Sequence, residues 1–345
     1  MNEVILLEKA IVVGATGGTG ASVAEELVKR GIRTVAFGRS RQKLEQLRAK
    51  LGNPEHMTIA VGDAFRPDHV VSASEGTDVL FHCANVPYNE MASKLVPLGE
   101  SVMEAADRLS LKVVAIDGIY PYGRRQTARA TEEHPKRPHT RKGKTRLAYE
   151  KMLFDERWSR AKVMIARLPD YYGPTANEAS YLGSTLEAIA AGKMAFFIGN
   201  MKVPREFVYL PDAAFMIAEL AGRDDAYGQN WHIPGAGLIS GKEIVRIARQ
   251  ASGSAKPVIP LGIVGLSLLG MGVPVMKEVV EMLYLTEEPL VLSGDKYERS
   301  IGPVRATTFE EGIRDTVQAL QRKNGASLAF NRPARREKSF LKDRQ

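Results

Sequence analysis

The chain has 345 residues and a formal net charge of +8, with 44% hydrophobic and 26% charged residues. This length suits one large α/β unit, or a nucleotide-binding domain with a smaller partner domain, and the apolar content is enough for a substantial core. The single cysteine, Cys83, excludes a disulfide framework and a multi-cysteine metal site. It fits the reducing cytoplasm, where we expect the protein. The six histidines lack metal-ligand spacing, so we expect no bound metal.

The excess positive charge is concentrated in two segments. Lys136–Arg146 contains six basic residues and no acid, and Arg332–Arg344 contains six basic residues against two acidic ones. The second segment has the composition of a solvated terminal tail. Since neither is accompanied by a recognition helix or a row of stacking aromatics, no nucleic-acid partner is expected.

Two apolar segments bear on targeting and membranes. Val4–Leu7 is too short for the apolar part of a signal peptide and is expected to lead into the first strand. Val258–Met276 is uncharged and nearly long enough to span a bilayer, but it contains two prolines and four glycines. This composition favours a buried or ligand-covering segment over a membrane span. Its apolar character fits a lipophilic ligand and equally an ordinary core.

Up to about residue 170, short β-rich runs alternate with helical patterns, which predicts a parallel sheet with crossover helices. The predicted strands are Ala10–Val13, Thr34–Phe37, Thr58–Val61, Val79–Cys83, Val113–Ile116 and Val163–Ala166. The predicted helices are Gly20–Lys29, Arg41–Lys50, Ala92–Arg108 and Thr145–Ser159. Six strands at this spacing predict an α/β fold with a doubly wound parallel sheet of the Rossmann type.

After Gly173 the alternation is less regular. Helices are predicted at Thr185–Ala191, Asp212–Ala221, Gly241–Ala251 with Ser240 as N-cap, Met276–Tyr284 and Phe309–Gln321. We therefore expect a dinucleotide-binding domain over 1–174, a smaller C-terminal substrate domain over most of 175–330, and a basic tail over 331–345. A segment near 205–222 is expected to return to the first domain.

A glycine-rich loop follows the first strand and precedes the first helix. Gly14 permits a tight turn, Gly17 allows the backbone to approach a pyrophosphate, and Gly20 allows close helix–strand packing. The first-turn amides and the positive end of the helix dipole then face the phosphates. This strand–loop–helix context predicts a dinucleotide site. The loop residues expected to contact the cofactor are Gly14, Thr16, Gly17, Gly18, Thr19 and Gly20.

The end of the second strand distinguishes NADP from NAD. An acidic residue there would bind the ribose 2′-hydroxyl of NAD, but the segment Gly38–Arg41 contains none. Arg39 and Ser40 instead suit a 2′-phosphate, so NADP is favoured over NAD. After the third strand, Asp63 and Ala64 are placed for the adenine, although Asp63 also suits the N-cap of the next turn.

Further motifs occur in a recognisable order: Leu80–Asn85, Tyr122–Gly123, Arg167–Pro174, Phe207–Ala214 and Asn230–Ile233. With the glycine loop, they resemble the motifs of the extended short-chain dehydrogenase/reductase family, also called the NAD-dependent epimerase/dehydratase family. The resemblance covers nearly the whole chain. It implies a cofactor site that also includes Ala84 and Pro169.

The family's catalytic residues are a serine after the fifth strand and a Tyr-x-x-x-Lys pair on the next helix. The resemblance places the serine on Gly118, beside Asp117, and the pair on Lys142 and Arg146. An alternative register places the pair on Leu147 and Lys151, and neither register supplies the tyrosine. The chain is therefore similar to atypical members of the family. The resemblance implies that Arg146 of this chain holds the nicotinamide ribose.

A replacement proton donor is expected among the tyrosines that follow the strands, namely Tyr88, Tyr120 and Tyr122. Tyr122 is the first choice, with Tyr120 as an alternative. Lys142 would serve only if burial or neighbouring cations lowered its pKa.

Three functions follow from these residues. The first is an NADP(H)-dependent oxidoreductase acting on a small carbonyl or alcohol. The others are a nucleotide-sugar epimerase or dehydratase, and an NADP-binding sensor or scaffold without hydride chemistry. The expected partner is a small-molecule substrate, and the sequence is compatible with a homodimer.

Overall fold

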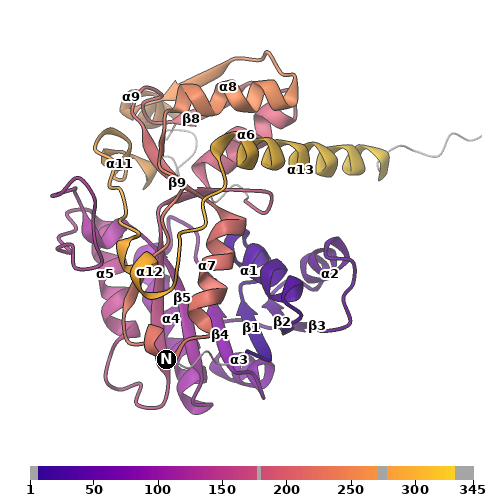
Figure 1. Ribbon diagram of the computed structural model, residues 1–345, viewed down its shortest axis with the longest axis vertical. Coiled ribbons are helices and arrows are strands. Elements are labelled where there is room, and N and C mark those ends of the chain that lie inside the picture. The colour runs from indigo at the N-terminus through magenta and orange to yellow at the C-terminus, as the bar shows by residue number, and fades with distance from the viewer. Residues whose placement is uncertain (1–6, 177–179, 270–277, 331–345) are drawn as a thin grey trace, which may run out of the picture.

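The computed structural model describes residues 7–176, 180–269 and 278–330. Its centre is a seven-stranded sheet in the order β3-β2-β1-β4-β5-β6-β10, in which every pair of neighbouring strands is parallel. The strands are β1 (Lys9–Val13), β2 (Arg33–Gly38), β3 (Met57–Val61), β4 (Val79–His82), β5 (Lys112–Gly118), β6 (Lys162–Leu168) and β10 (Asn230–His232). The predicted doubly wound parallel sheet is thus confirmed (Figure 1).

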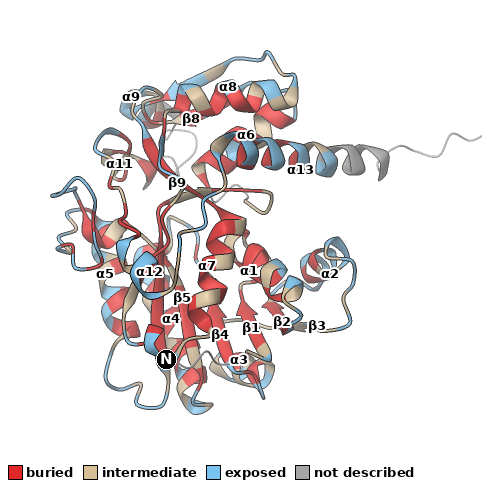
Figure 2. Cartoon of the chain, viewed as in Figure 1, coloured by how far each residue is buried: buried red, intermediate tan, exposed pale blue. Residues whose placement is uncertain are grey.

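Helices cover both faces of this sheet. One face packs against α1 (Gly18–Lys29), α2 (Arg41–Lys50) and α7 (Leu210–Ala221), and the other against α3 (Pro67–Ser74), α4 (Met91–Arg108) and α5 (Arg141–Leu153). Successive residues of β1 alternate between the faces, since Val12 joins the first cluster and Ile11 and Val13 join the second. Strands buried on both sides explain the continuous apolar runs in the sequence, and Figure 2 shows them as buried.

Three elements around the main sheet differ from the sequence prediction, and in the rest of the chain the predicted helix Thr185–Ala191 extends over Tyr181–Ala190. Helix α5 begins at Arg141 instead of Thr145, because the Thr140 hydroxyl caps it by accepting a hydrogen bond from the Gly143 amide at 3.0 Å. The same helix ends at Leu153 instead of Ser159. Helix α3 and strand β10 were not predicted, since eight and three residues are too short to display a clear periodicity.

The rest of the chain builds two smaller sheets beside the carboxyl ends of the main strands. Strands β7 (Asp170–Tyr172), β9 (Arg205–Tyr209) and β11 (Leu238–Ile239) form one, and β8 (Ala195–Ile198) and β12 (Val258–Leu261) form the other. The helices of this part are α6 (Tyr181–Ala190), α8 (Gly241–Ser252), α9 (Ile263–Leu269), α11 (Tyr284–Glu287), α12 (Asp295–Ser300) and α13 (Phe309–Phe330), and two 3₁₀ turns, η1 (Tyr120–Tyr122) and η2 (Asp224–Ala226), complete the elements.

Helix α8 begins as predicted, because Ser240 accepts a hydrogen bond from the Glu243 amide at 3.2 Å. The start of the predicted helix Met276–Tyr284 lies outside the described residues, and so does the end of the apolar segment Val258–Met276. The described part of this apolar segment forms β12 and α9.

The two parts of the chain interleave at α7. This helix follows β9 but packs against α1, where Arg30 pairs with Glu219 and donates to the Phe215 carbonyl at 3.2 Å. Because β9 and α7 are consecutive, the smaller sheet is tied directly to the layer that holds the glycine loop. This fixes the crevice between the two parts.

Candidate active site

The glycine loop lies where β1 and β4 end side by side. Gly14 has a φ of +86°, and a Cβ built on it would lie 2.6 Å from both Cα and N of Ala84. A Cβ on Gly20 would collide with the Gly14 carbonyl oxygen. Both positions therefore require glycine, for the turn and for the close helix–strand contact. Ala84 touches the loop directly, in keeping with its expected place at the cofactor.

Helix α1 leaves its first turn open to a ligand. Its N-cap is Gly17, so no side chain caps the first amides, which are those of Gly18 and Thr19 and of Gly20 after them. Uncapped amides at a helix N-terminus form a ready anion site. The backbone of Thr175 and Ala176 passes within 3.3 Å of a Cβ built on Gly18. The residues present fit a dinucleotide pyrophosphate at this turn.

The end of β2 has the side chains predicted for the adenine ribose. Arg39 is exposed and Ser40 caps α2, accepting a hydrogen bond from the Lys43 amide at 3.3 Å. The Thr16 hydroxyl lies 3.8 Å from a Cβ built on Gly38. Thr16 of the glycine loop therefore lies beside the end of β2, which directly precedes Arg39 and Ser40 in the chain.

Asp63 and Ala64 lie after β3 at the same edge of the sheet. The Asp63 carboxylate accepts a hydrogen bond from the Phe65 amide at 3.1 Å, and its own amide donates to His69 at 3.2 Å. Since the N-cap of α3 is Arg66, Asp63 does not cap that helix. Its carboxylate instead shapes the turn beside Phe65, which is 38% exposed.

A buried chain of charges crosses the ends of β5 and β6. Asp117 accepts from Arg146 at 2.8 Å and from Arg167 at 3.1 Å, and Arg167 also donates to Glu150 at 2.9 Å. The side chains of Asp117 and Arg167 are fully buried. Lys136 pairs with the other oxygen of Glu150. Each buried charge in this chain has a partner of opposite sign, whereas a lone buried ion would have none.

Arg146 is therefore held in a fixed position at the end of β5. Besides Asp117, it donates to the Asn85 side chain at 3.3 Å, while its Nε atom is buried without a partner among the described residues. An unpaired donor on an otherwise anchored guanidinium fits a hydroxyl acceptor such as a ribose. Lys151, which the alternative register would use, is exposed on the helix. Lys142 and Arg146 thus form the pair that faces the site.

Lys142 occupies the position of the family's tyrosine, and two carboxylates hold it. Its ammonium pairs with Glu278 and, at 3.1 Å, with Glu281, and only 2% of its side chain is exposed. The ammonium also lies 4.6 Å from the centre of the Tyr88 ring. Both glutamates lie about 140 residues away in sequence, and nothing in the sequence marked them as partners.

Three tyrosine hydroxyls form a chain next to Lys142. The Tyr88 hydroxyl lies 2.9 Å from that of Tyr120, and the Tyr181 hydroxyl donates to Tyr88 at 3.0 Å. All three side chains are partly exposed. Burial against the neighbouring elements is the main cause that raises the pKa of each phenol. These hydroxyls therefore remain protonated at neutral pH.

Tyr122, the first choice from the sequence, lies elsewhere. Its side chain is fully buried and its hydroxyl lies 2.6 Å from His232 Nε2. The ring packs 5.1 Å from the Arg167 guanidinium, behind the charged chain. This geometry disfavours Tyr122 as a donor, because an inward-facing, occupied hydroxyl does not reach a substrate. No pattern in the sequence separates Tyr122 from Tyr120, because the two residues are two positions apart in the same 3₁₀ turn.

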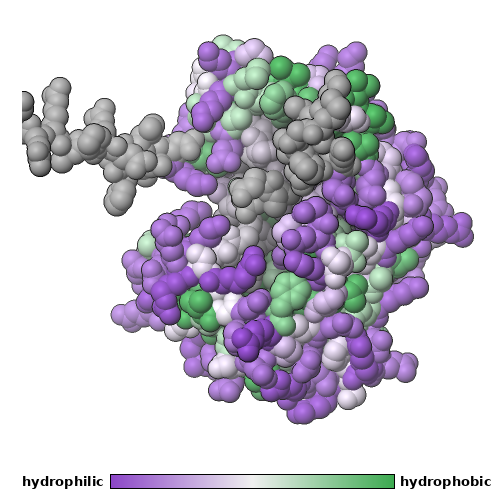
Figure 3. All heavy atoms as spheres, turned by 180° about the vertical axis from the view of Figure 1, so that it is seen from behind, coloured by the Kyte–Doolittle hydropathy of each residue, from purple (hydrophilic) through white to green (hydrophobic). Residues whose placement is uncertain are grey.

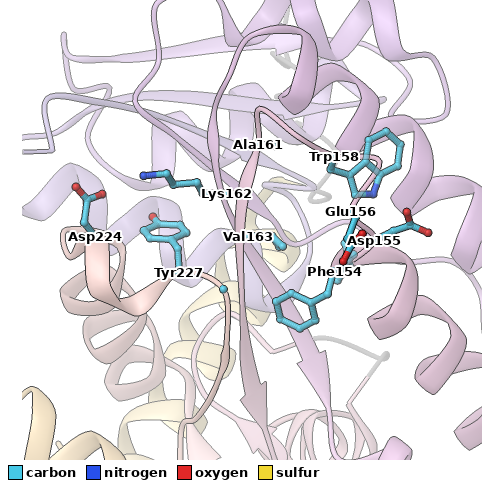
Figure 4. Close-up of a pocket in the computed structure, with 11 residues that line it drawn as sticks. Phe154, Asp155, Glu156, Trp158, Ala161, Lys162, Val163, Asp224 and Tyr227 are labelled. Carbon is cyan, nitrogen blue, oxygen red and sulfur yellow. The ribbon is translucent and has the colours of Figure 1, made fainter.

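Two cavities lie at opposite ends of the sheet. A small one of about 20 Å³ lies at the carboxyl ends, where Pro169, Asp170 and Arg205 meet Leu285 and Leu290. A wider one of about 430 Å³ lies at the amino ends of β6 and β10, between Trp158 and Phe154 on one side and Lys162, Asp224 and Tyr227 on the other (Figure 4). Ligands of open α/β sheets bind at the carboxyl ends. The tyrosines and the first cavity therefore mark the candidate site.

Two further searches bear on ligands. Within the described ranges, no group of three His, Cys, Asp or Glu side chains is arranged to hold a metal ion. None of the helices in the part of the chain that the structure describes has the length and apolarity needed to cross a membrane.

The sheet, the glycine loop and the crevice define a dinucleotide-binding protein of the Rossmann class. The chain belongs to the NAD dependent epimerase/dehydratase family, whose model matches residues 10–233. This confirms the resemblance drawn from the sequence motifs.

Solved structures agree on the fold. The chain is similar to UDP-glucuronic acid 4-epimerase from Bacillus cereus, solved in complex with NAD, with a TM-score of 0.73 and 16% identity over 91% of this chain and 99% of that one. Such low identity shows the fold alone. The NAD in that structure gives no support for a preference for NADP.

Curated relatives match short segments only. A very-long-chain 3-oxoacyl-CoA reductase from Bos taurus is 46% identical over 57 residues, which are 16% of this chain and 18% of the relative. A 2-alkyl-3-oxoalkanoate reductase from Shewanella oneidensis is 34% identical over 77 residues, which are 22% of this chain and 18% of the relative. The chain thus spans less than a fifth of the length of these relatives.

Proposed function

We propose that the protein is an NADP(H)-dependent oxidoreductase that acts on a small carbonyl or alcohol, with Tyr120 as the proton donor. The observation that carries this proposal is the hydroxyl chain of Tyr120, Tyr88 and Tyr181 at the carboxyl ends of the strands. It supplies the phenol that the usual catalytic position lacks. The two curated relatives are both named as reductases, which favours carbonyl chemistry.

Each residue has a role in this reaction. The uncapped turn of α1 holds the pyrophosphate, Arg39 the 2′-phosphate, and Arg146 the nicotinamide ribose. When bound, the nicotinamide supplies the hydride. Tyr120 gives its hydroxyl proton to the substrate oxygen, and Tyr88 and Tyr181 return a proton to Tyr120 along their hydrogen bonds. Tyr181, which is partly exposed, takes its own proton back from solvent.

Turnover of a panel of carbonyl compounds with NADPH tests the assignment of Tyr120. Removing a general acid lowers the rate by about 100-fold or more, so we expect Tyr120→Phe to lose this much of kcat/KM. The matched control is Tyr227→Phe, whose hydroxyl bonds the Ala221 carbonyl at 3.0 Å, far from the crevice. Full activity of Tyr120→Phe, or a greater loss in Tyr122→Phe with the fold intact, would disprove the assignment.

The preference for NADP is tested separately by titrating NADPH and NADH against the intact protein. A charge-assisted hydrogen bond contributes about 1.5–3 kcal/mol, so Arg39→Ala should weaken NADPH binding about tenfold or more and leave NADH binding unchanged. Arg41→Ala, with its side chain about as exposed and two residues away, is the control. Equal loss for both dinucleotides would contradict the proposal.

A second candidate is a protein that binds NADP without hydride chemistry. The carboxylates that hold Lys142 favour it, because they leave no free ammonium at the usual catalytic position. It predicts dinucleotide binding without turnover of any substrate.

A third candidate is a nucleotide-sugar epimerase or dehydratase, which the overall likeness to a UDP-glucuronic acid 4-epimerase favours. Arg205 is a buried cation at the small cavity that already lies 3.6 Å from the Asp170 carboxylate, so a pyrophosphate would have to displace that carboxylate. If this candidate were right, a nucleotide sugar would raise the melting temperature of the NADP-bound protein.

A further inference from the structure

Exposed apolar side chains gather along the outer edge of the β8–β12 sheet. Phe196 and Ile259 are register partners on the two strands and are 42% and 40% exposed. Ile263 and Val264, at the start of α9, are 61% and 74% exposed, and Met194, just before β8, is 51% exposed. We call these five residues the apolar patch. Figure 1 draws α9 and β8 at the upper left, so they lie at the upper right in the reversed view of Figure 3, where hydrophobic surface is visible.

The apolar patch is not needed to complete the core. The other face of β8 packs inward, with Phe197 only 1% exposed among α6 and α8 residues. Helix α9 likewise buries Leu266 completely, against Leu261. Phe196 alternates with Phe197 along β8, so it lies on the face of the strand that points away from this packing. Scattered apolar residues are ordinary on a surface, but a contiguous set of large ones marks an interaction site.

Three lysines lie close to the apolar patch in the sequence. Lys193 precedes Met194, Lys202 follows β8, and Lys256 precedes β12, and all three side chains are exposed. The stretches 188–205 and 244–277, which supply the patch and these lysines, contain no aspartate or glutamate. None of the three lysines makes an ion pair with a described residue. An apolar centre with a cationic rim is complementary to an anionic bilayer, whose headgroups meet the lysines while its acyl boundary receives the apolar side chains.

We propose that the apolar patch, with Lys193, Lys202 and Lys256, docks this protein on the surface of an anionic lipid bilayer. A second copy of the chain fits less well, because pairing two such faces would bring their lysines together without an acid between them. Docking at α9 also has a consequence for the candidate site. The buried side of α9 belongs to a cluster that includes Tyr88 and Tyr181, so the bilayer would lie just outside that wall.

Co-sedimentation of the full chain with vesicles tests this proposal, and it needs neither cofactor nor substrate. We expect binding to vesicles of phosphatidylcholine mixed with phosphatidylglycerol, little binding to phosphatidylcholine alone, and weakening by salt. The double variant Ile263→Glu/Val264→Glu should lower the partition coefficient at least about tenfold. Lys193→Glu/Lys256→Glu should lower it about fivefold or more per lysine.

Leu238→Glu is the matched control, since Leu238 is 52% exposed but lies on β11, outside the apolar patch. It should bind vesicles like the unchanged protein, and the basic tail 331–345 is the same in all variants. Circular dichroism verifies that each variant is folded. The proposal is overturned if the unchanged protein stays in the supernatant with both vesicles, if binding ignores phosphatidylglycerol, or if Leu238→Glu loses as much as Ile263→Glu/Val264→Glu. It is also overturned if light scattering shows a dimer that this double variant dissociates.

Discussion

Asp117 is the residue whose removal tests the buried charge chain most directly. Its two oxygens accept from Arg146 at 2.8 Å and Arg167 at 3.1 Å, and its side chain is fully buried. In Asp117→Ala, Arg167 keeps Glu150 and the Gly118 carbonyl, but Arg146 keeps only the Asn85 contact at 3.3 Å. Breaking a buried pair by removing one partner costs about 3–5 kcal/mol. Because Arg167 remains paired, we expect the lower end, about 3 kcal/mol.

Urea unfolding monitored by circular dichroism measures this loss. A change of about 3 kcal/mol is a large fraction of the 5–15 kcal/mol typical of a folded domain, so the midpoint should fall clearly. The control is Asp68→Ala, which removes an ion pair of the same length, 2.8 Å to Arg108, from the exposed surface. Exposed pairs contribute little, so this variant should unfold like the unchanged protein. Equal midpoints for the two variants would refute the idea that the charge chain supports the site.

Three more predictions follow from particular contacts. Gly20→Ala should weaken NADPH binding at least about tenfold, because the added Cβ would collide with the Gly14 carbonyl oxygen. Gly262→Ala is the control, because no atom lies within 4 Å of its added Cβ, and it should leave the affinity unchanged. Fluorescence titration with NADPH compares the two variants, and equal affinities would contradict the glycine assignment. Burial lowers the pKa of His82 to about 4. Between about pH 6.5 and pH 4, the unfolded chain therefore binds a proton at this histidine that the folded chain does not bind. The free energy of unfolding should therefore be full above about pH 6.5 and fall by up to about 3 kcal/mol as the pH approaches 4. Urea midpoints measured at about pH 7.5 and about pH 5 should differ less in His82→Met than in the unchanged protein. The same difference in both proteins would exclude His82 as the cause. Lys142→Ala should leave Glu281 without its ion-pair partner and Glu278 with only the exposed Arg141. It should lower the melting temperature more than Lys94→Ala, whose ion pair with Glu90 is surface-exposed; a smaller loss would show that the lysine is not a structural link.

The sheet and the cofactor loop were predictable because their signals are local. Strand β1, the glycine loop and α1 follow one another within about 20 residues, and each has its own pattern of apolar residues or glycines. Six of the seven sheet strands were predicted within two residues at each end. The seventh, Asn230–His232, pairs with β6 only after the chain has passed through the smaller sheets. Such a short, late strand has no local signature.

The candidate site was harder to predict because its decisive contacts are long-range. The sequence marked Lys142, but its partners Glu278 and Glu281 come from the far end of the chain. Tyr120 and Tyr122 are both tyrosines after the same strand, and only the 3₁₀ turn directs one hydroxyl to Tyr88 and the other to His232. Periodicity cannot reveal which way a side chain points in such a turn.

The two positions that the family resemblance assigns to the catalytic pair hold cations with acidic partners. A lysine introduced alone at the tyrosine position would be a buried, unpaired charge, and so would an arginine at the lysine position. Here Lys142 meets two glutamates and Arg146 meets Asp117, so each new cation has an acid from another element. The hydroxyls of Tyr120, Tyr88 and Tyr181 lie beside this arrangement and are joined to one another by hydrogen bonds.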